Sequence, residues 1–147
     1  MEKLKENDLL KSSKIEVSPA TFNLVSVHWD HWRLLLNNPQ FSPRMTAPFM
    51  IFMDGHEVTL MLDDADLVNI QPGLTEAKIE RAYRLLTFDI VLDHSVVGFM
   101  AEIARILAEA NISILPISAF SRDSILIKQD QLATALRALR PYVDDVC

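Results

Sequence analysis

Two histidines and an aspartate in the segment "HWDHW" are the first residues whose chemistry suggests a site. His28 and His31 lie three residues apart, so on a helix they would share one face, with Asp30 beside them. Imidazole and carboxylate groups are zinc ligands, and the acidic run "DDAD" follows at residues 63–66. The spacing fixes no third ligand, so we expect the two tryptophans to cover an apolar edge and no metal to bind.

A glycine raises the second chemical question. Gly98 lies near the start of "DHSVVGFMAEIARILAEAN" (residues 93–111), whose apolar residues recur at steps of three and four and predict an amphipathic helix. A glycine weakens a helix by up to about 1 kcal/mol relative to alanine. Close packing of this helix on a sheet is one explanation for the glycine, and close approach of a ligand to the backbone is another.

Composition excludes several classes of function. The chain has 147 residues, half of them apolar, which is enough for a core in one domain or two small ones. A net charge of −6, with 14 basic and 20 acidic residues, argues against nucleic acid or an anionic membrane as the main partner. Cys147 is the only cysteine, and no apolar run suits a signal peptide or a membrane span, so we expect a cytoplasmic protein.

Sequence motifs of catalysis are also missing. The chain contains no glycine-rich phosphate loop, no Ser-His-Asp arrangement and no metal-enzyme signature. We therefore expect no cofactor. An enzyme built on "HWDHW" stays as a third hypothesis.

The second half of the chain has a regular order of elements. A strand "YRLLTFDIVL" precedes the helix of residues 93–111, two short strands "ISILPISAF" and "SILIK" follow, and a helix capped by Asp130 runs to Pro141. This order predicts a ferredoxin-like βαββαβ unit in which the last strand is missing. Either "YVDDVC" supplies a very short strand, or a strand from the first half takes its place. Pro116 suits the edge strand that this topology puts after the first helix.

The first half is less regular and predicts a smaller, β-rich unit. Residues 1–13 read as a flexible arm, followed by the strands "KIEV" and "TFNLVSV" and one turn of helix at "HWDHW". The segment "PFMIFMDGHEVTLML" predicts a hairpin with a two-residue turn at Asp54-Gly55, and "NIQPGLTEAK" a connection to the second half. The expected division is therefore an arm at 1–13, one unit at 14–71 and a second unit at 72–147.

The second half resembles a known family over "FDIVLDHSVVGFMAEIARILAEANISILPISAFSRDSILIKQDQLATALRAL". The shared features are Gly98, the run "LAEANISI", Ile117 and Ser118 followed by Phe120, and Asp123 before "ILI". These features resemble the ACT domain, in particular that of small tandem-ACT proteins related to the CASTOR arginine sensors and to aspartate kinase regulatory domains.

A weaker similarity covers the hairpin "IFMDGHEVTLML", in which Glu57 and Thr59 stand at family positions. Together the two resemblances imply an α+β protein with a ferredoxin-like (ACT) βαββαβ unit preceded by a shorter, degenerate ACT-like β-rich unit. They also imply a regulatory or sensory module that is not an enzyme and that forms a homo-oligomer.

The resemblance implies a ligand site as well. In ACT domains an amino acid or similar small molecule lies between two such units or two chains, against the loop that enters the first helix. If Asp93 or Ser95 caps that helix, the next N–H groups lack intrahelical acceptors and could hold a carboxylate, which Gly98 lets approach. The ammonium group would then need Asp123 or the carbonyls of residues 118–120, and His94 could donate to the ligand. The expected ligand-binding residues are Asp93, His94, Ser95, Val96, Val97, Gly98, Phe99, Ser118, Phe120, Asp123 and Glu57.

Simpler roles are open for several of these residues. Asp123 would also suit a turn between two strands, Glu57 a solvated position beside a tight turn, and His94 an exposed position. At Arg122 and Ser124 the chain differs from the related sequences, close to the expected site. The alternative function is an ACT-fold interaction module without a small ligand, whose exposed strand edge pairs with a partner subunit.

Overall fold

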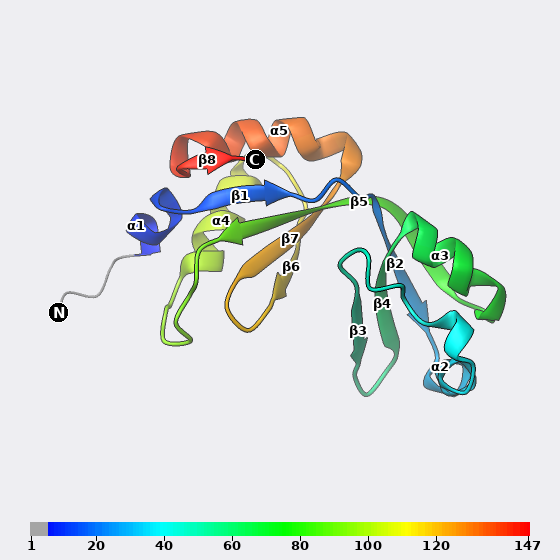
Figure 1. Cartoon of the computed structure of the whole chain (residues 1–147). Coiled ribbons are helices and arrows are strands. Elements are labelled where there is room, and N and C mark those ends of the chain that lie inside the picture. The colour runs from blue at the N-terminus through cyan, green and yellow to red at the C-terminus, as the bar shows by residue number, and fades with distance from the viewer. Residues whose placement is uncertain (1–5) are drawn as a thin grey trace. The chain divides into compact units, whose positions relative to one another are not determined.

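The chain folds into two compact units (Figure 1), which a computed structural model describes for residues 6–147. The inserted unit is Ala20–Tyr83, and the split unit combines the chain up to Pro19 with Arg84–Cys147. This division differs from the one expected at 71/72. The reason is that the first strand of the chain pairs with a strand of the second half, so the split unit is discontinuous in sequence.

The split unit contains the order of elements expected for the second half of the chain. Its elements are α1 (Glu6–Lys11), β1 (Lys14–Val17), residues 84–89 of β5 (Lys78–Asp89), α4 (Phe99–Glu109), β6 (Leu115–Ser118), β7 (Asp123–Lys128), η3 (Gln129–Gln131), α5 (Leu132–Leu139), η4 (Arg140–Tyr142) and β8 (Asp145–Val146). The strands lie in the order β6-β7-β5-β1-β8. β6 is therefore an edge strand, which confirms the position expected from Pro116.

The sequence left two candidates for the missing strand of this unit, a strand from the first half or a short strand at "YVDDVC", and the structure contains both. β1 pairs antiparallel with β5, with Lys14 opposite Asp89 and Val17 opposite Leu86. β8 has only two residues and pairs in parallel with β1. A strand that precedes the inserted unit therefore takes the place next to β5, and the short C-terminal strand extends the sheet beyond it.

The core of the split unit is built from one face of this sheet together with α4 and α5. Ile103 and Leu107 of α4 are 0% exposed, as is Ile125 of β7. Phe88 of β5 and Phe99 of α4 meet edge to face, with ring centroids 5.9 Å apart. The amphipathic helix predicted from its apolar spacing therefore covers the sheet.

Part of the expected flexible arm belongs to this core. Residues 1–5 of the arm lie outside the described residues, but residues 6–11 form α1, which packs against α4. Leu10 is 1% exposed, and the buried Ser13 donates its Oγ–H to the Leu10 carbonyl at 2.7 Å. The segment "ENDLLK" is too short and polar to show this helix by its periodicity, and Leu10 joins it to the core.

The inserted unit repeats the strand-helix-strand-strand-helix-strand order. Its elements are β2 (Phe22–Val27), α2 (Trp29–Leu36), η1 (Pro39–Phe41), β3 (Met50–Met53), β4 (Val58–Asp63), α3 (Asp64–Ile70), η2 (Gln71–Gly73) and residues 78–83 of β5. The strand order β3-β4-β2-β5 corresponds to β6-β7-β5-β1 of the split unit. The unit is thus more helical than expected, because "HWDHW" begins an eight-residue helix and a second helix, α3, runs from the acidic run into the start of the expected connection.

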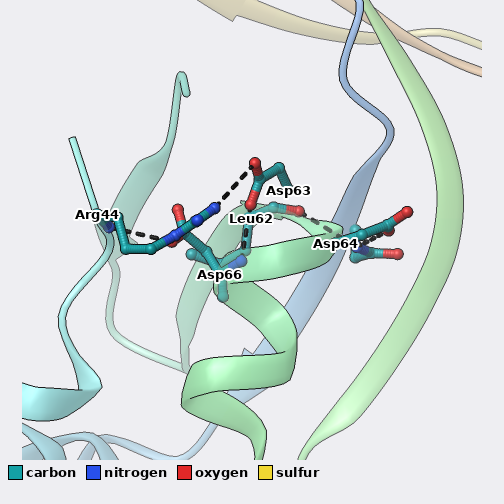
Figure 2. Close-up of polar contacts among 6 residues, drawn as sticks. Arg44, Leu62, Asp63, Asp64 and Asp66 are labelled. Carbon is teal, nitrogen blue, oxygen red and sulfur yellow. Dashed lines mark hydrogen bonds and ion pairs between the residues drawn. The ribbon is translucent and has the colours of Figure 1, made fainter. Parts of the chain in front are cut away.

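Figure 2 shows why α3 starts where it does. Asp63 is the N-cap, and its Oδ1 accepts from the Asp66 N–H at 2.7 Å. The Asp66 side chain is fully buried, and its Oδ1 accepts from the backbone N–H and from the Nε–H of Arg44, at 3.0 and 2.8 Å. The bond to Asp66 is the main cause that raises the pKa of Arg44. The acidic run weighed above as metal ligands is therefore a helix start, joined to the loop before β3.

The hairpin expected around "DG" is present, but with a longer turn. β3 and β4 pair as far as Met53 and Val58, so the turn has four residues instead of two. Asp54 Oδ1 accepts from the N–H groups of His56 and Glu57, at 2.7 and 2.9 Å. These bonds lower the pKa of Asp54 and close the turn through its side chain.

β5 changes register at the boundary between its two parts. In the inserted unit Phe22 faces Tyr83 while Leu24 faces Glu80, so two residues of β5 stand opposite one residue of β2. One of the two, Ala82, has φ of 68°, which is unfavourable for a residue with a Cβ. The irregularity therefore lies just before the point at which β5 passes from the inserted to the split unit.

Replacement of one β1 side chain tests whether this strand is part of the fold. Ile15 is 0% exposed, so Ile15→Ala should lower the free energy of unfolding by about 2 to 5 kcal/mol. Glu16→Ala, at the exposed neighbouring position, should change it by less than about 0.5 kcal/mol. Urea unfolding measures both variants, and equal effects would show that β1 contributes nothing specific.

Tyr83 should make the free energy of unfolding depend on pH in the alkaline range. Its hydroxyl donates to Glu80 Oε2 at 2.7 Å, and burial together with this bond raises the pKa of Tyr83 to about 12. An unfolded tyrosine ionises near pH 10, so the free energy of unfolding should fall as pH rises from about 10 to 12. Tyr83→Phe should flatten that fall in urea unfolding and remove the tyrosinate absorbance step near pH 12. A step near pH 12 that survives in Tyr83→Phe and disappears in Tyr142→Phe would contradict this assignment.

Candidate functional site

A cavity of about 390 Å³ opens at one end of the split unit. Three segments line it, namely the loop after β5, the first turn of α4 and the turn between β6 and β7. Figure 1 shows this loop and this turn at the same end of the unit. Eight of the eleven residues expected from the sequence line the cavity: Asp93, His94, Val96, Gly98, Phe99, Ser118, Phe120 and Asp123.

The loop before α4 is shaped by a turn and not by a helix cap. Asp93 Oδ1 accepts from the N–H of Ser95 at 2.9 Å and from its Oγ–H at 2.6 Å. The N–H of Val96 donates to the Asp93 carbonyl at 2.9 Å. The expectation that Asp93 or Ser95 caps a helix beginning at Val96 is therefore wrong. α4 begins three residues later, at Phe99, because the polar side chains bond to one another within the turn.

Gly98 is the N-cap of α4 and lies outside its interior. Its φ of 91° and ψ of −2° fall in the left-handed region, which costs an L-residue roughly 1 to 2 kcal/mol and glycine almost nothing. The sequence offered close packing or ligand approach as reasons for the glycine. The backbone conformation supplies a third reason, and it holds whether or not a ligand binds.

The first turn of α4 offers free backbone donors to the cavity. The first N–H groups of a helix have no intrahelical acceptor, and here the ladder begins with Glu102 N–H donating to the Gly98 carbonyl at 3.0 Å. No side chain of the described residues caps the helix, and residues 99–101 line the cavity. These donors stand at the positive end of the helix dipole, where an anion is stabilised.

Glu102 is the acidic residue of this turn, and it does not line the cavity. Arg105 donates to both of its carboxylate oxygens, at 2.6 and 3.1 Å. These bonds are the main cause that lowers the pKa of Glu102. The negative charge nearest in sequence to the free N–H groups is thus paired with a cation of the same helix.

The turn between β6 and β7 is bonded to the loop after β5. Leu92 N–H donates to the Ser121 carbonyl at 2.8 Å, and His94 Nε2 lies 2.8 Å from the Phe120 carbonyl. Because a carbonyl only accepts, His94 carries its proton on Nε2. That proton is therefore not free for the ligand, contrary to one role expected for His94. The ring of His94 also meets that of Phe120 edge to face.

Asp123 is the carboxylate placed best to accept from an ammonium group. It begins β7 and lines the cavity, and one oxygen, Oδ1, accepts from the Ser118 hydroxyl at 2.9 Å. Residues 99–101, whose N–H groups have no intrahelical acceptor, and Asp123 therefore line the same cavity. The donors are complementary to the carboxylate of a zwitterionic amino acid, and the carboxylate of Asp123 is complementary to its ammonium group.

Three expected residues do not line the cavity. Ser95 bonds to Asp93, Val97 is 82% exposed, and Glu57 belongs to the inserted unit. Six lining residues were not expected from the sequence: Leu92, Met100, Ala101, Ala119, Ser121 and Arg122. The later helix start accounts for Met100 and Ala101. Arg122, at which the chain differs from the related sequences, is thus a lining residue of the cavity.

The corresponding corner of the inserted unit is built from different side chains. A cavity of about 410 Å³ there is lined by Trp29, Trp32 and Leu36 of α2 and by residues 53–55 of the hairpin, together with Arg33. The N-cap of α2 is His28, whose Nδ1 accepts from the Asp30 N–H at 3.2 Å. Within residues 6–147 no group of three or more potential ligands is arranged to hold a metal ion.

Comparison with known proteins identifies one part of the chain. Residues 78–141 match the family model of the ACT domain. The chain is therefore similar to the ACT domain over these residues. The comparison with curated proteins finds no match, and none of the described helices has the length and apolar character needed to cross a membrane.

Solved structures show the same fold along nearly the whole chain. A protein from Agrobacterium tumefaciens is 11% identical with a TM-score of 0.73, covering 92% of each chain. A protein of unknown function from Vibrio cholerae is 25% identical with a TM-score of 0.65, covering 93% of this chain and 94% of that one. The regulatory subunit of aspartate kinase from Thermus thermophilus is 12% identical with a TM-score of 0.61, covering 90% and 98%. The ferredoxin-like ACT fold is therefore shared with regulatory domains.

A glycine-to-alanine pair tests the backbone role of Gly98. Gly98→Ala should lower the free energy of unfolding by about 1 to 2 kcal/mol, because φ of 91° is strained for alanine. Gly55→Ala is the matched control, since a Cβ there meets no atom within 4 Å and its φ is not positive, so its effect should be neutral or slightly stabilising. Urea unfolding compares them. Equal values would show that the left-handed conformation does not require the glycine.

Proposed function

We propose that this protein is a non-catalytic sensor that binds an amino acid at the start of α4 and signals its presence through a partner or a second copy of the chain. The observation that carries the proposal is the pairing, in one cavity, of the uncapped N–H groups of residues 99–101 with the carboxylate of Asp123. The N–H groups suit a carboxylate, and Asp123 suits an ammonium group.

The size and the framework of the cavity support this function. Small-molecule pockets usually enclose about 300 to 1,000 Å³, and this one encloses about 390 Å³. Its two walls are held by the bonds from Leu92 to Ser121 and from His94 to Phe120. The ACT domain and the likeness to a regulatory subunit of aspartate kinase are in keeping with a regulatory role. No catalytic step is part of the proposal.

A second function, that of an interaction module without a small ligand, is favoured by one observation. β3 is an edge strand of the inserted unit that pairs only with β4, and Ile51, Phe52 and Met53 on it are 42%, 58% and 64% exposed. An apolar edge without charged residues is a surface for strand pairing with a partner. Under this alternative, amino acids leave the stability of the protein unchanged.

A thermal-shift panel of the twenty amino acids at millimolar concentration tests the proposal. A ligand present at about 100 times its Kd stabilises the folded state by about 2.7 kcal/mol, so at least one amino acid should raise Tm by several degrees. The N-acetylated form of that amino acid lacks the ammonium group and its amide form lacks the carboxylate, so neither should raise Tm.

Substitution of the carboxylate locates the binding. Asp123→Asn should remove most of the shift, whereas Asp130→Asn, an exposed aspartate outside the cavity, should preserve it. A flat response to the whole panel would reject the sensor function. A shift that survives both N-acetylation and Asp123→Asn would reject the proposed orientation of the ligand.

A further inference from the structure

Arg122 is the one lysine or arginine among the described residues that line the cavity. It is the last residue of the turn between β6 and β7, and its side chain is 41% exposed. Nε donates to Asp89 Oδ1 at 2.8 Å, which joins the turn to the end of β5. A cation is therefore held within a site in which the carboxylate of Asp123 suits an ammonium group.

The guanidinium group of Arg122 keeps donors free for another partner. Arginine has five N–H donors in a planar fork, and the bond to Asp89 uses the one on Nε. Among the described residues, the side chain of Arg122 makes no other hydrogen bond and no other ion pair within 4.0 Å. The terminal nitrogens Nη1 and Nη2 can thus bind a carboxylate with two parallel bonds while Asp89 holds the group in place.

The backbone around Arg122 is fixed on both sides. Its carbonyl accepts from the Ala119 N–H at 3.0 Å, which closes the turn, and the preceding carbonyl, that of Ser121, accepts from Leu92 N–H. Two residues further on, Ser124 Oγ lies 2.9 Å from Thr87 Oγ1 of β5. A ligand that binds Arg122 therefore loses little free energy in ordering the turn, since the turn is already ordered.

We propose that Arg122 binds a second acidic group on the ligand, so that the site selects an amino acid with a carboxylate side chain. The proposal rests on the function proposed above, in which the N–H groups of α4 take the α-carboxylate and Asp123 takes the ammonium group. A third charged group on the ligand then meets Arg122, which attracts a carboxylate and repels the cationic side chain of a lysine or arginine ligand. Asp93, the other carboxylate in the lining, has its Oδ1 engaged by Ser95.

Isothermal titration of the full chain with isosteric ligands tests this selectivity. We expect aspartate or glutamate to bind at least about 10-fold more tightly than the amide of the same shape, asparagine or glutamine, because a charge-assisted pair is lost in the amide. Lysine should bind more weakly still. Added salt should weaken the acidic ligand more than the amide.

Two substitutions of Arg122 assign the preference to its side chain. Arg122→Gln should weaken the acidic ligand at least about 10-fold and change binding of the amide by less than about 3-fold. Arg122→Lys keeps a positive charge beside Asp89 but loses the planar guanidinium group. It should therefore retain the fold and only part of the preference for the acidic ligand. Arg137→Gln, an exposed arginine on α5 outside the cavity, should leave both ligands unchanged.

The possible failures are distinguishable. If the acid and its amide bind with equal affinity, and Arg122→Gln changes neither, the proposed selectivity for an acidic side chain is wrong. The proposed sensor function is not affected by that result. An equal loss of all amino acids in Arg122→Gln would show that Arg122 holds the α-carboxylate, which also overturns the proposed selectivity. Binding of no amino acid at all would overturn both proposals. Circular dichroism shows whether each variant is folded. If Arg122→Gln does not fold, the ligand preference of Arg122→Lys tests the proposal instead.

Discussion

The pairing of β1 with the C-terminal part of β5 is the contact on which the split unit depends. Without β1, the side of β5 away from β7 would expose a row of unpaired N–H and C=O groups. The ladder runs from Val17 opposite Leu86 to Lys14 opposite Asp89. It therefore ends where the loop to α4 begins, and Asp89, its last residue, is the carboxylate that holds Arg122. The position of one wall of the cavity follows from this pairing.

The parts of the fold that follow local patterns could be predicted from the sequence, and those that depend on distant pairing could not. The stripe of Ile103 and Leu107 on α4 predicts a helix on a sheet whatever surrounds it. "KIEV" reads as a strand, but nothing within it shows that Ile15 pairs with Phe88, more than seventy residues away. The division expected at 71/72 differs from the two compact units for this reason, because it treats each unit as continuous in sequence.

α3 shows a different limit. The capping aspartate, the acidic first turn and the buried Leu67 and Ile70, three residues apart, are helix signals that the sequence does contain. The run of aspartates was read for its charge and not for this pattern. That Asp66 is fully buried could not have been foreseen, since burial of a carboxylate requires a partner, and Arg44 comes from a loop 22 residues away.

The candidate site was predicted in its segments but not in its detail. Groups that could bind a zwitterion were found because their types are visible in the sequence. The helix start was misplaced because Asp93 and Ser95 are both good caps, and only the structure shows that they bond to each other. The bonds from Leu92 and His94 to the hairpin turn join residues that are 26 or more positions apart, so the cavity itself has no local signal.

The two units have the same strand order. They differ in the side chains at the corner between the first helix and the hairpin turn, which is where the candidate ligand site of the split unit lies. At the start of α2, His28 takes the Asp30 N–H, Asp30 adds a negative charge to the first turn, and Trp29 and Trp32 line the cavity. At the start of α4, glycine stands where that cap would be, and the acidic residue of the turn is paired with Arg105. A side chain therefore occupies the helix start at the first corner, whereas at the second the first N–H groups of the helix are left without a side-chain cap. The same strand order therefore carries a helix start covered by tryptophan side chains in one unit and an uncapped helix start in the other.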